Sequence, residues 1–151
     1  MRGRKPKPTH VKAITGNPGK RPLNAAEPLP ELIAPDQIPE PPRELNERAT
    51  AEWNRLAKQL SALRILTHLD LAALASYCAA YGLWAEAIEA VNTYGTMVKS
   101  PTGFPMQSPY LAIANRQAEI MLRISSEFGF TPASRSRIVG RDTKEPDLFG
   151  D

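Results

Sequence analysis

Seven of the 15 prolines fall within residues 22–42, and this cluster limits the fold more than any other feature of the sequence. Proline fixes φ and has no backbone N–H, so the stretch can form neither a helix nor a central strand. We therefore expect residues 22–43 to be an extended connector. Residues 1–21 contain further prolines and glycines without an apolar period, which predicts a flexible arm. Four apolar side chains could pin the connector to a folded body: Leu29, Leu32, Ile33 and Ile38.

The formal charge of +3 is unevenly distributed along the chain. Residues 1–22 contain seven Lys or Arg and no acid, whereas residues 23–133 contain eight Lys or Arg against twelve Asp or Glu. A basic arm on an acidic body is typical of a segment that binds a polyanion, and short arms of this kind can insert arginine into a DNA minor groove. The arm residues predicted to contact DNA are Arg2, Arg4, Lys5, Lys7, Lys12, Lys20 and Arg21.

A second basic cluster lies near the C-terminus, after a Thr-Pro pair that predicts a short helix through about residue 138. The cluster could contact phosphates or pair with an acidic protein surface, and the sequence favours neither. Its arginines are Arg135, Arg137 and Arg141. In the polar tail, residues 140–151, Leu148 and Phe149 stand among acidic residues. This pattern indicates a docking peptide for a larger partner, with a plain terminal tail as the alternative.

Hydrophobic periodicity predicts a mainly α body over residues 44–139, with three long helices. The first helix begins after Asn46, a capping residue, and carries one apolar face. The second runs from about residue 68 to 93 and follows a capping-box pattern formed by Thr67 and Asp70. Hydrophobic residues make up 42% of the chain, which is enough for one packed core.

The segment 94–109 changes character and predicts a small hairpin or ordered loop, because Pro and Gly occupy turn positions in its middle. Pro105 should weaken the second strand. A Ser-Pro pair then starts a third long helix at Pro109, and Gly129 ends it. The expected fold is therefore three long helices, a short C-terminal helix and a hairpin, preceded by the extended, Pro-rich basic arm.

The third helix is apolar on two sides, and a helix of this kind usually buries both. Since the body has only three long helices, one side could face a second copy of the chain. The residues predicted for this oligomer interface are Ile113, Ile120 and Ile124.

Side chains that could carry other chemistry have simpler explanations. Four aromatic residues could stack on bases, but their helical spacing among Leu and Ile favours core packing: Trp53, Tyr77, Tyr81 and Trp84. His10, His68 and Cys78 show no metal-ligand spacing. The Gly-rich segment 16–20 lacks the spacing and the Ser or Thr of a phosphate-binding loop. We expect no enzyme activity, no metal site and no cofactor.

Cysteine use and hydropathy bear on the compartment. The single cysteine, Cys78, fits a reducing cytoplasm. No uninterrupted apolar run of about 18 residues occurs, so no membrane helix is expected. The basic N-terminus is not followed by the apolar stretch of a secretory signal.

Four segments together resemble the P27-type bacteriophage terminase small subunits. They are Gly-Arg-Lys-Pro-Lys-Pro-Thr at 3–9, Thr-Gly-Asn-Pro-Gly-Lys-Arg-Pro-Leu-Asn at 15–24, Leu-Thr-His-Leu-Asp at 66–70 and Phe-Gly-Phe-Thr-Pro-Ala-Ser-Arg-Ser-Arg at 128–137. The resemblance implies a non-catalytic subunit that acts in the host bacterial cytoplasm. Such a subunit binds viral double-stranded DNA, forms a homo-oligomeric ring and brings DNA to the terminase large subunit, which holds the ATPase and nuclease.

The chain departs from this family pattern at its N-terminus. Many small terminases begin with a helix-turn-helix DNA-binding domain, which the prolines of residues 1–42 exclude here. DNA contact would then come from the arm, from the C-terminal arginines or from surfaces created by oligomerisation. The competing interpretation is a non-catalytic DNA-binding regulator that acts as a dimer.

Overall fold

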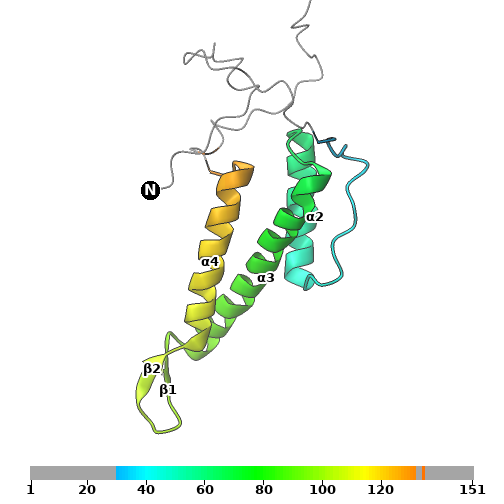
Figure 1. Cartoon of the computed structure of the whole chain (residues 1–151). Coiled ribbons are helices and arrows are strands. Elements are labelled where there is room, and N and C mark those ends of the chain that lie inside the picture. The colour runs from blue at the N-terminus through cyan, green and yellow to red at the C-terminus, as the bar shows by residue number, and fades with distance from the viewer. Residues whose placement is uncertain (1–29, 132–133, 135–151) are drawn as a thin grey trace, which may run out of the picture.

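The computed structural model describes residues 30–131 and Ser134 (Figure 1). It confirms the predicted mainly α fold with a small hairpin. The basic arm lies outside the described residues, and so does the short C-terminal helix apart from Ser134. In chain order the elements are α2 (Glu47–Ala62), the 3-10 turn η1 (His68–Asp70), α3 (Leu71–Tyr94), β1 (Met97–Lys99), β2 (Pro105–Gln107) and α4 (Pro109–Phe128).

Helix α3 lies in the middle, with α2 on one side and α4 on the other (Figure 1). The antiparallel hairpin β1–β2 joins α3 to α4 and projects beyond the start of α2. Pro105 pairs with Lys99 at the end of the hairpin ladder, where a missing N–H removes little. The body therefore has two distinct ends. We call the end that carries β1–β2 the hairpin end, and the opposite end, where α2 and α4 finish, the tail end.

Side-chain caps fix where the helices begin. Asn46 Oδ1 accepts a hydrogen bond from the Ala49 amide at 2.8 Å, as expected for the cap of α2. Asp70 Oδ2 accepts from the Thr67 amide at 2.9 Å, which confirms the predicted contact. The second helix nevertheless begins as a 3-10 turn before α3 starts at Leu71. Gly129, at φ 71°, ends α4 in the left-handed conformation that favours glycine.

Polar contacts join α2 to α3 at the start of α2. Asn46 Nδ2 donates to Glu86 Oε1 at 2.6 Å, and Arg48 pairs with Glu89. Gly82 faces this junction, because a β-carbon at that position would lie 2.4 Å from Asn46 Oδ1. The close approach of the two helices therefore depends on the absence of a side chain at Gly82.

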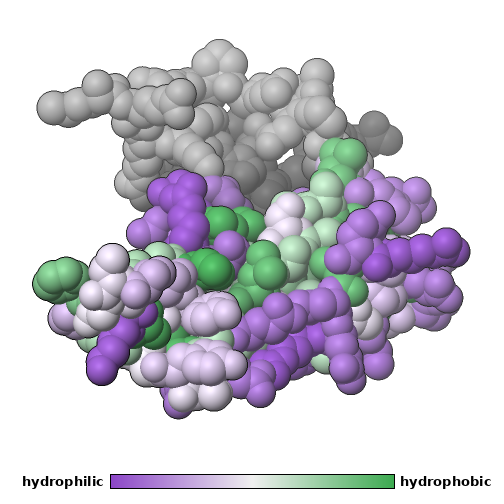
Figure 2. All heavy atoms as spheres, turned by 90° about the horizontal axis from the view of Figure 1, so that it is seen from below, coloured by the Kyte–Doolittle hydropathy of each residue, from purple (hydrophilic) through white to green (hydrophobic). Residues whose placement is uncertain are grey.

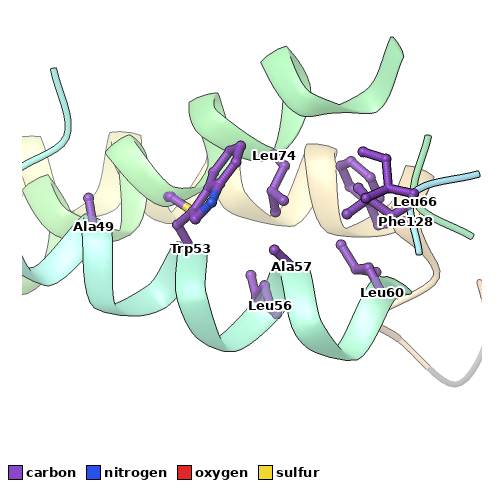
Figure 3. Packing of buried hydrophobic residues seen from close by; sticks show 10 residues of the cluster. Ala49, Trp53, Leu56, Ala57, Leu60, Leu66, Leu74 and Phe128 are labelled. Carbon is purple, nitrogen blue, oxygen red and sulfur yellow. The ribbon is translucent and has the colours of Figure 1, made fainter. Parts of the chain in front are cut away.

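The core lies between the three helices towards the tail end (Figure 3). Trp53 is 1% exposed, in agreement with its predicted packing role, and its indole N–H donates to the Pro39 carbonyl at 3.3 Å. The other buried members include Leu56, Leu60, Leu66, Leu74 and Phe128. Indole and aliphatic side chains of α2 thus meet the start of α3 and the end of α4.

The Pro-rich connector packs against this core. From Pro30 to Leu45 it forms no helix and no strand beyond one isolated bridge, between Leu32 and Thr67. Ile33 is buried, its amide donates to the Leu66 carbonyl at 2.9 Å, and its carbonyl accepts from Ser61 Oγ at 2.7 Å. Ile33 thus fastens the first part of the connector to the body, and Ile38 and the Pro39 carbonyl add contacts further along.

Helix α3 departs from its expected pattern. The sequence suggests one aromatic and aliphatic stripe, yet Tyr77, Tyr81 and Trp84 are only half-buried. The fully buried positions are mostly small: Leu74, Cys78, Ala80, Gly82 and Ala87. The reason is geometric, because a helix between two neighbours needs small residues where both approach closely. The large side chains then occupy its flanks.

The same helix has more apolar surface than the chain itself covers. Among the described residues, the segment His68–Tyr94 is long and apolar enough to span a membrane, although it contains no uninterrupted apolar run of about 18 residues. Only 28% of its most apolar 18-residue window is buried within the chain. A core helix of a soluble monomer is usually mostly buried, so this fraction indicates surface left for a further contact.

Candidate functional site

The predicted DNA-binding residues fall outside the described part of the chain. This holds for all seven cations of the arm and for Arg135, Arg137 and Arg141. Leu148 and Phe149, the predicted docking pair, also lie outside it. The described residues do show where the segments that carry these side chains join the body.

Both segments join the body at the tail end. On the N-terminal side, the connector enters through Ile33, which contacts Leu66 just before η1. On the C-terminal side, α4 ends at Phe128, in the same buried cluster as Ile33 and Leu66. Phe130 then packs edge-on against Tyr77, with ring centroids 5.3 Å apart. The charged ends of the sequence are thus attached on one side of the molecule, away from the hairpin (Figure 1).

A groove of about 610 Å³ opens at the tail end between α2 and the end of α4. Its apolar lining comes from Leu56, Leu60, Leu63, Ile65, Phe128 and Phe130. Its polar lining comes from Arg55, Gln59 and Tyr77. Leu63 is 61% exposed, which leaves a large apolar side chain open to solvent on one wall.

The electrostatics of the groove are set by one ion pair. Glu52 is only 5% exposed, and Arg55 donates to both of its carboxylate oxygens, at 2.6 and 2.8 Å. The hydrogen bond to Glu52 raises the pKa of Arg55. Burial raises the pKa of Tyr77, so its hydroxyl remains a proton donor at neutral pH. The polar groups of the groove are therefore mainly hydrogen-bond donors.

Cys78 carries a buried thiol that is not paired with a charged group in the described part of the chain. Cys78 is 0% exposed, and burial raises its pKa to about 12. A thiol with that pKa is almost wholly protonated near neutral pH and is a poor nucleophile. Among residues 30–131 and Ser134, no three His, Cys, Asp or Glu side chains gather where they could hold a metal ion.

The predicted interface isoleucines occupy different settings. Ile113 is 42% exposed, Ile120 is half-buried, and Ile124 packs against the core of its own chain. Ile113 is therefore the most accessible of the three. The sequence reasoning missed Leu122, which is 66% exposed on another side of α4. Its position between Met121 and Arg123 gave no separate signal, because periodicity reports the strongest apolar face only.

Apolar side chains also collect at the hairpin end. Met97, Phe104 and Met106 are 56%, 71% and 44% exposed on β1, the turn and β2. At the base of the hairpin, Tyr94 and Tyr110 stack with ring centroids 6.1 Å apart. Figure 2, seen from this end, shows hydrophobic residues at the surface among hydrophilic ones. The sequence predicted the hairpin but not its exposed apolar tip, since a strand pattern does not show which face is covered.

A family model described as "Phage terminase, small subunit" matches residues 49–145. No curated protein and no solved structure matches the chain. The matched region begins two residues into α2 and contains α3, α4 and the C-terminal arginines, together with the segments 66–70 and 128–137 that carry part of the resemblance. The segments 3–9 and 15–24 lie outside it, so the P27 type stays a prediction. Because the match covers more than half of the sequence, the chain belongs to the phage terminase small-subunit family, which generally supplies the non-catalytic subunit of the packaging enzyme.

Proposed function

We propose that this small subunit is a non-enzymatic adaptor that gathers viral double-stranded DNA through its basic arms and presents it to the terminase large subunit. The observation that carries the proposal is the attachment of both charged segments at the tail end. Ile33, where the N-terminal connector is fastened, and Phe128, where α4 finishes, belong to one buried cluster. DNA-binding and partner-binding segments attached at one end could act on the same stretch of DNA.

The charge distribution supports DNA binding through the arm. The arm carries seven cations, whereas residues 23–133 carry more acids than bases. A net acidic body repels DNA at long range, which favours the arm and the C-terminal arginines as the source of attraction. Each phosphate that a cation neutralises releases counterions, which makes such binding strongly salt-dependent. Several arms in one assembly would multiply the effect by raising the local concentration of binding groups.

Exposed apolar surface on two helices supports assembly into an oligomer. On α3, Leu83 is 45% exposed, and only 28% of the most apolar 18-residue window is buried within the chain. On α4, Ile113 and Leu122 are both exposed, and at about 100° per residue they point roughly 180° apart around the helix. A closed ring needs two different patches on each subunit, because every subunit contacts two neighbours through unlike surfaces. Patches on opposite sides of α4 meet that requirement.

The proposed setting is the cytoplasm of the host bacterium, where the large subunit would supply the ATPase and nuclease. The C-terminal pair Leu148–Phe149 is the proposed contact with that subunit. A short peptide with two apolar side chains among acids suits a groove on a larger partner.

Native mass spectrometry of the full chain tests the proposal. We expect masses several times that of one chain, and a further complex when large subunit and DNA are added. A single chain at micromolar concentration contradicts the oligomeric adaptor. A dimer that protects a palindromic DNA site and ignores the large subunit would instead establish the regulator.

Two substitutions sharpen this test. Ile113→Asp and Leu122→Asp each place a charge on one proposed patch and should shift the mass towards smaller species. Leu69→Asp is the matched control, because Leu69 is 76% exposed but belongs to η1 and not to α4. If all three variants keep the full mass, α4 does not form the interface.

A further inference from the structure

We infer that the groove at the tail end is a docking site for the chain's own C-terminal segment, residues 145–151, with Leu148 and Phe149 seated among its apolar side chains. The inference concerns the chain alone. Its consequence for the large subunit rests on the proposed function.

The groove has the chemistry of a site for an apolar peptide with acidic flanks. Leu63, on one wall, is 61% exposed. A peptide that fills the groove would bury much of this apolar side chain, which is favourable. Arg55, Gln59 and Tyr77 place hydrogen-bond donors at its edge. No Asp or Glu among the described residues lines it, although Glu52 lies behind Arg55 and pairs with it. Such a groove accepts a carboxylate beside an apolar side chain and disfavours a basic peptide.

The C-terminal segment has the complementary composition. Leu148 and Phe149 are adjacent, and they lie between Asp147 and Asp151, with Glu145 before them. No Lys or Arg follows Lys144. The segment therefore brings two apolar side chains and only negative side-chain charge to a groove whose edge offers donors.

The chain also starts from the right place to reach the groove. Phe130 lines the groove, and the chain continues directly from it through Thr131. An extended chain spans about 3.3–3.6 Å per residue, so the sequence between Thr131 and Leu148 is more than long enough to return. A tether of that length also keeps the local concentration of the segment in the millimolar range, so even weak complementarity fills the groove.

Docking would make the chain's own groove compete with a protein partner for the C-terminal segment. While Leu148 and Phe149 lie in the groove, they are unavailable to a protein partner, and the partner must displace them. The partner can bind only the undocked segment. Its apparent affinity is therefore its intrinsic affinity multiplied by the fraction of time that the segment is free. The tail would then engage the large subunit weakly until another event, such as DNA binding at the same end, releases it.

Disulfide trapping in the full chain tests the docking without any partner. The pair Leu63→Cys with Phe149→Cys should form an intramolecular disulfide about tenfold faster than the control pair Leu83→Cys with Phe149→Cys. Leu83 is 45% exposed on α3 and does not line the groove. The native Cys78 does not compete, because it is fully buried. Adding Leu148→Asp to the first pair should remove its advantage.

Three results would overturn the inference. They are equal rates for the two pairs, an advantage that survives Leu148→Asp, and a product that runs as a disulfide-linked dimer, which would place the segment on a neighbouring copy. The proposed function has a separate readout. If the trapped pair forms as expected but the large subunit does not bind the chain, docking stands and the adaptor role fails.

Discussion

Substituting alanine at Gly82 should destabilise the protein, although alanine favours helices. In an exposed helix interior, Gly→Ala stabilises by about 1 kcal/mol. Here the added β-carbon would lie 2.4 Å from Asn46 Oδ1, so Asn46 must move. That movement breaks the cap on Ala49, worth about 1 kcal/mol, and the hydrogen bond to Glu86, worth about 0.5–1.5 kcal/mol. We expect a net loss of about 0.5–1.5 kcal/mol in the free energy of unfolding.

A second substitution should reverse the sign. Asn46→Gly removes the three atoms nearest to the new β-carbon. As a cap it costs only a few tenths of a kcal/mol, apart from the lost bond to Glu86. In that background Gly82→Ala should stabilise by about 0.5–1 kcal/mol, which gives a coupling energy of about 1–2.5 kcal/mol between the two sites.

Urea unfolding followed by tryptophan fluorescence (Trp53 and Trp84) measures this cycle. All four proteins must be compared at one chain concentration, because assembly adds to apparent stability. If Gly82→Ala stabilises equally with and without the Asn46 side chain, the proposed close approach of α2 to α3 is wrong.

Three further outcomes follow from the structure. Ser61→Ala should cost about 1–3 kcal/mol, because it leaves the buried Ile33 carbonyl without its donor, whereas Ser126→Ala, whose bond is exposed, should cost almost nothing in the same unfolding assay. Because burial raises the pKa of Cys78 to about 12, the unfolded thiol ionises first as pH rises. The free energy of unfolding should thus fall as pH rises from about 9 to 12, whereas thiol ionisation should not change it near pH 7. Cys78→Ala should make the free energy of unfolding less dependent on pH in the alkaline range. A thiol reagent at pH 8 should label Cys78 slowly in the native protein and quickly in urea, and fast native labelling would contradict its burial.

Much of the fold could be predicted because local signals and tertiary packing agree. Asn46, the Thr67–Asp70 box, Pro109 and Gly129 mark helix boundaries through their own backbone chemistry, and the structure keeps each of them. The proline cluster excludes a helix for the connector, and the described part of it is irregular. Signals of this kind need no knowledge of neighbouring elements.

The packing partners of α3 could not be predicted in the same way. Periodicity shows which residues are apolar, but contact with two helices at once selects small residues such as Ala80 and Gly82 for burial. The aromatic residues then move to the flanks. The same limit applies to α4, where Ile124 joins the core of its own chain while Leu122 is left exposed.

The groove was not visible in the sequence at all. Its walls come from the end of α2, from Tyr77 on α3 and from Phe128 to Phe130, which are distant in the chain. Leu148 and Phe149, which we propose to occupy the groove, could be recognised as a docking pair from composition. The groove itself could not, because it depends on how α4 ends beside α2.

The dependence of DNA affinity on salt tests the central claim most directly. Deleting residues 1–21 removes seven cations from the full chain. Each lost phosphate contact should reduce the slope of log affinity against log salt by about 0.9. The account predicts weaker binding and a much shallower slope for the deletion, and nearly unchanged binding for Arg116→Gln, which removes one exposed cation from the net acidic body. If the deletion leaves both the affinity and the slope unchanged, the arm does not hold the DNA.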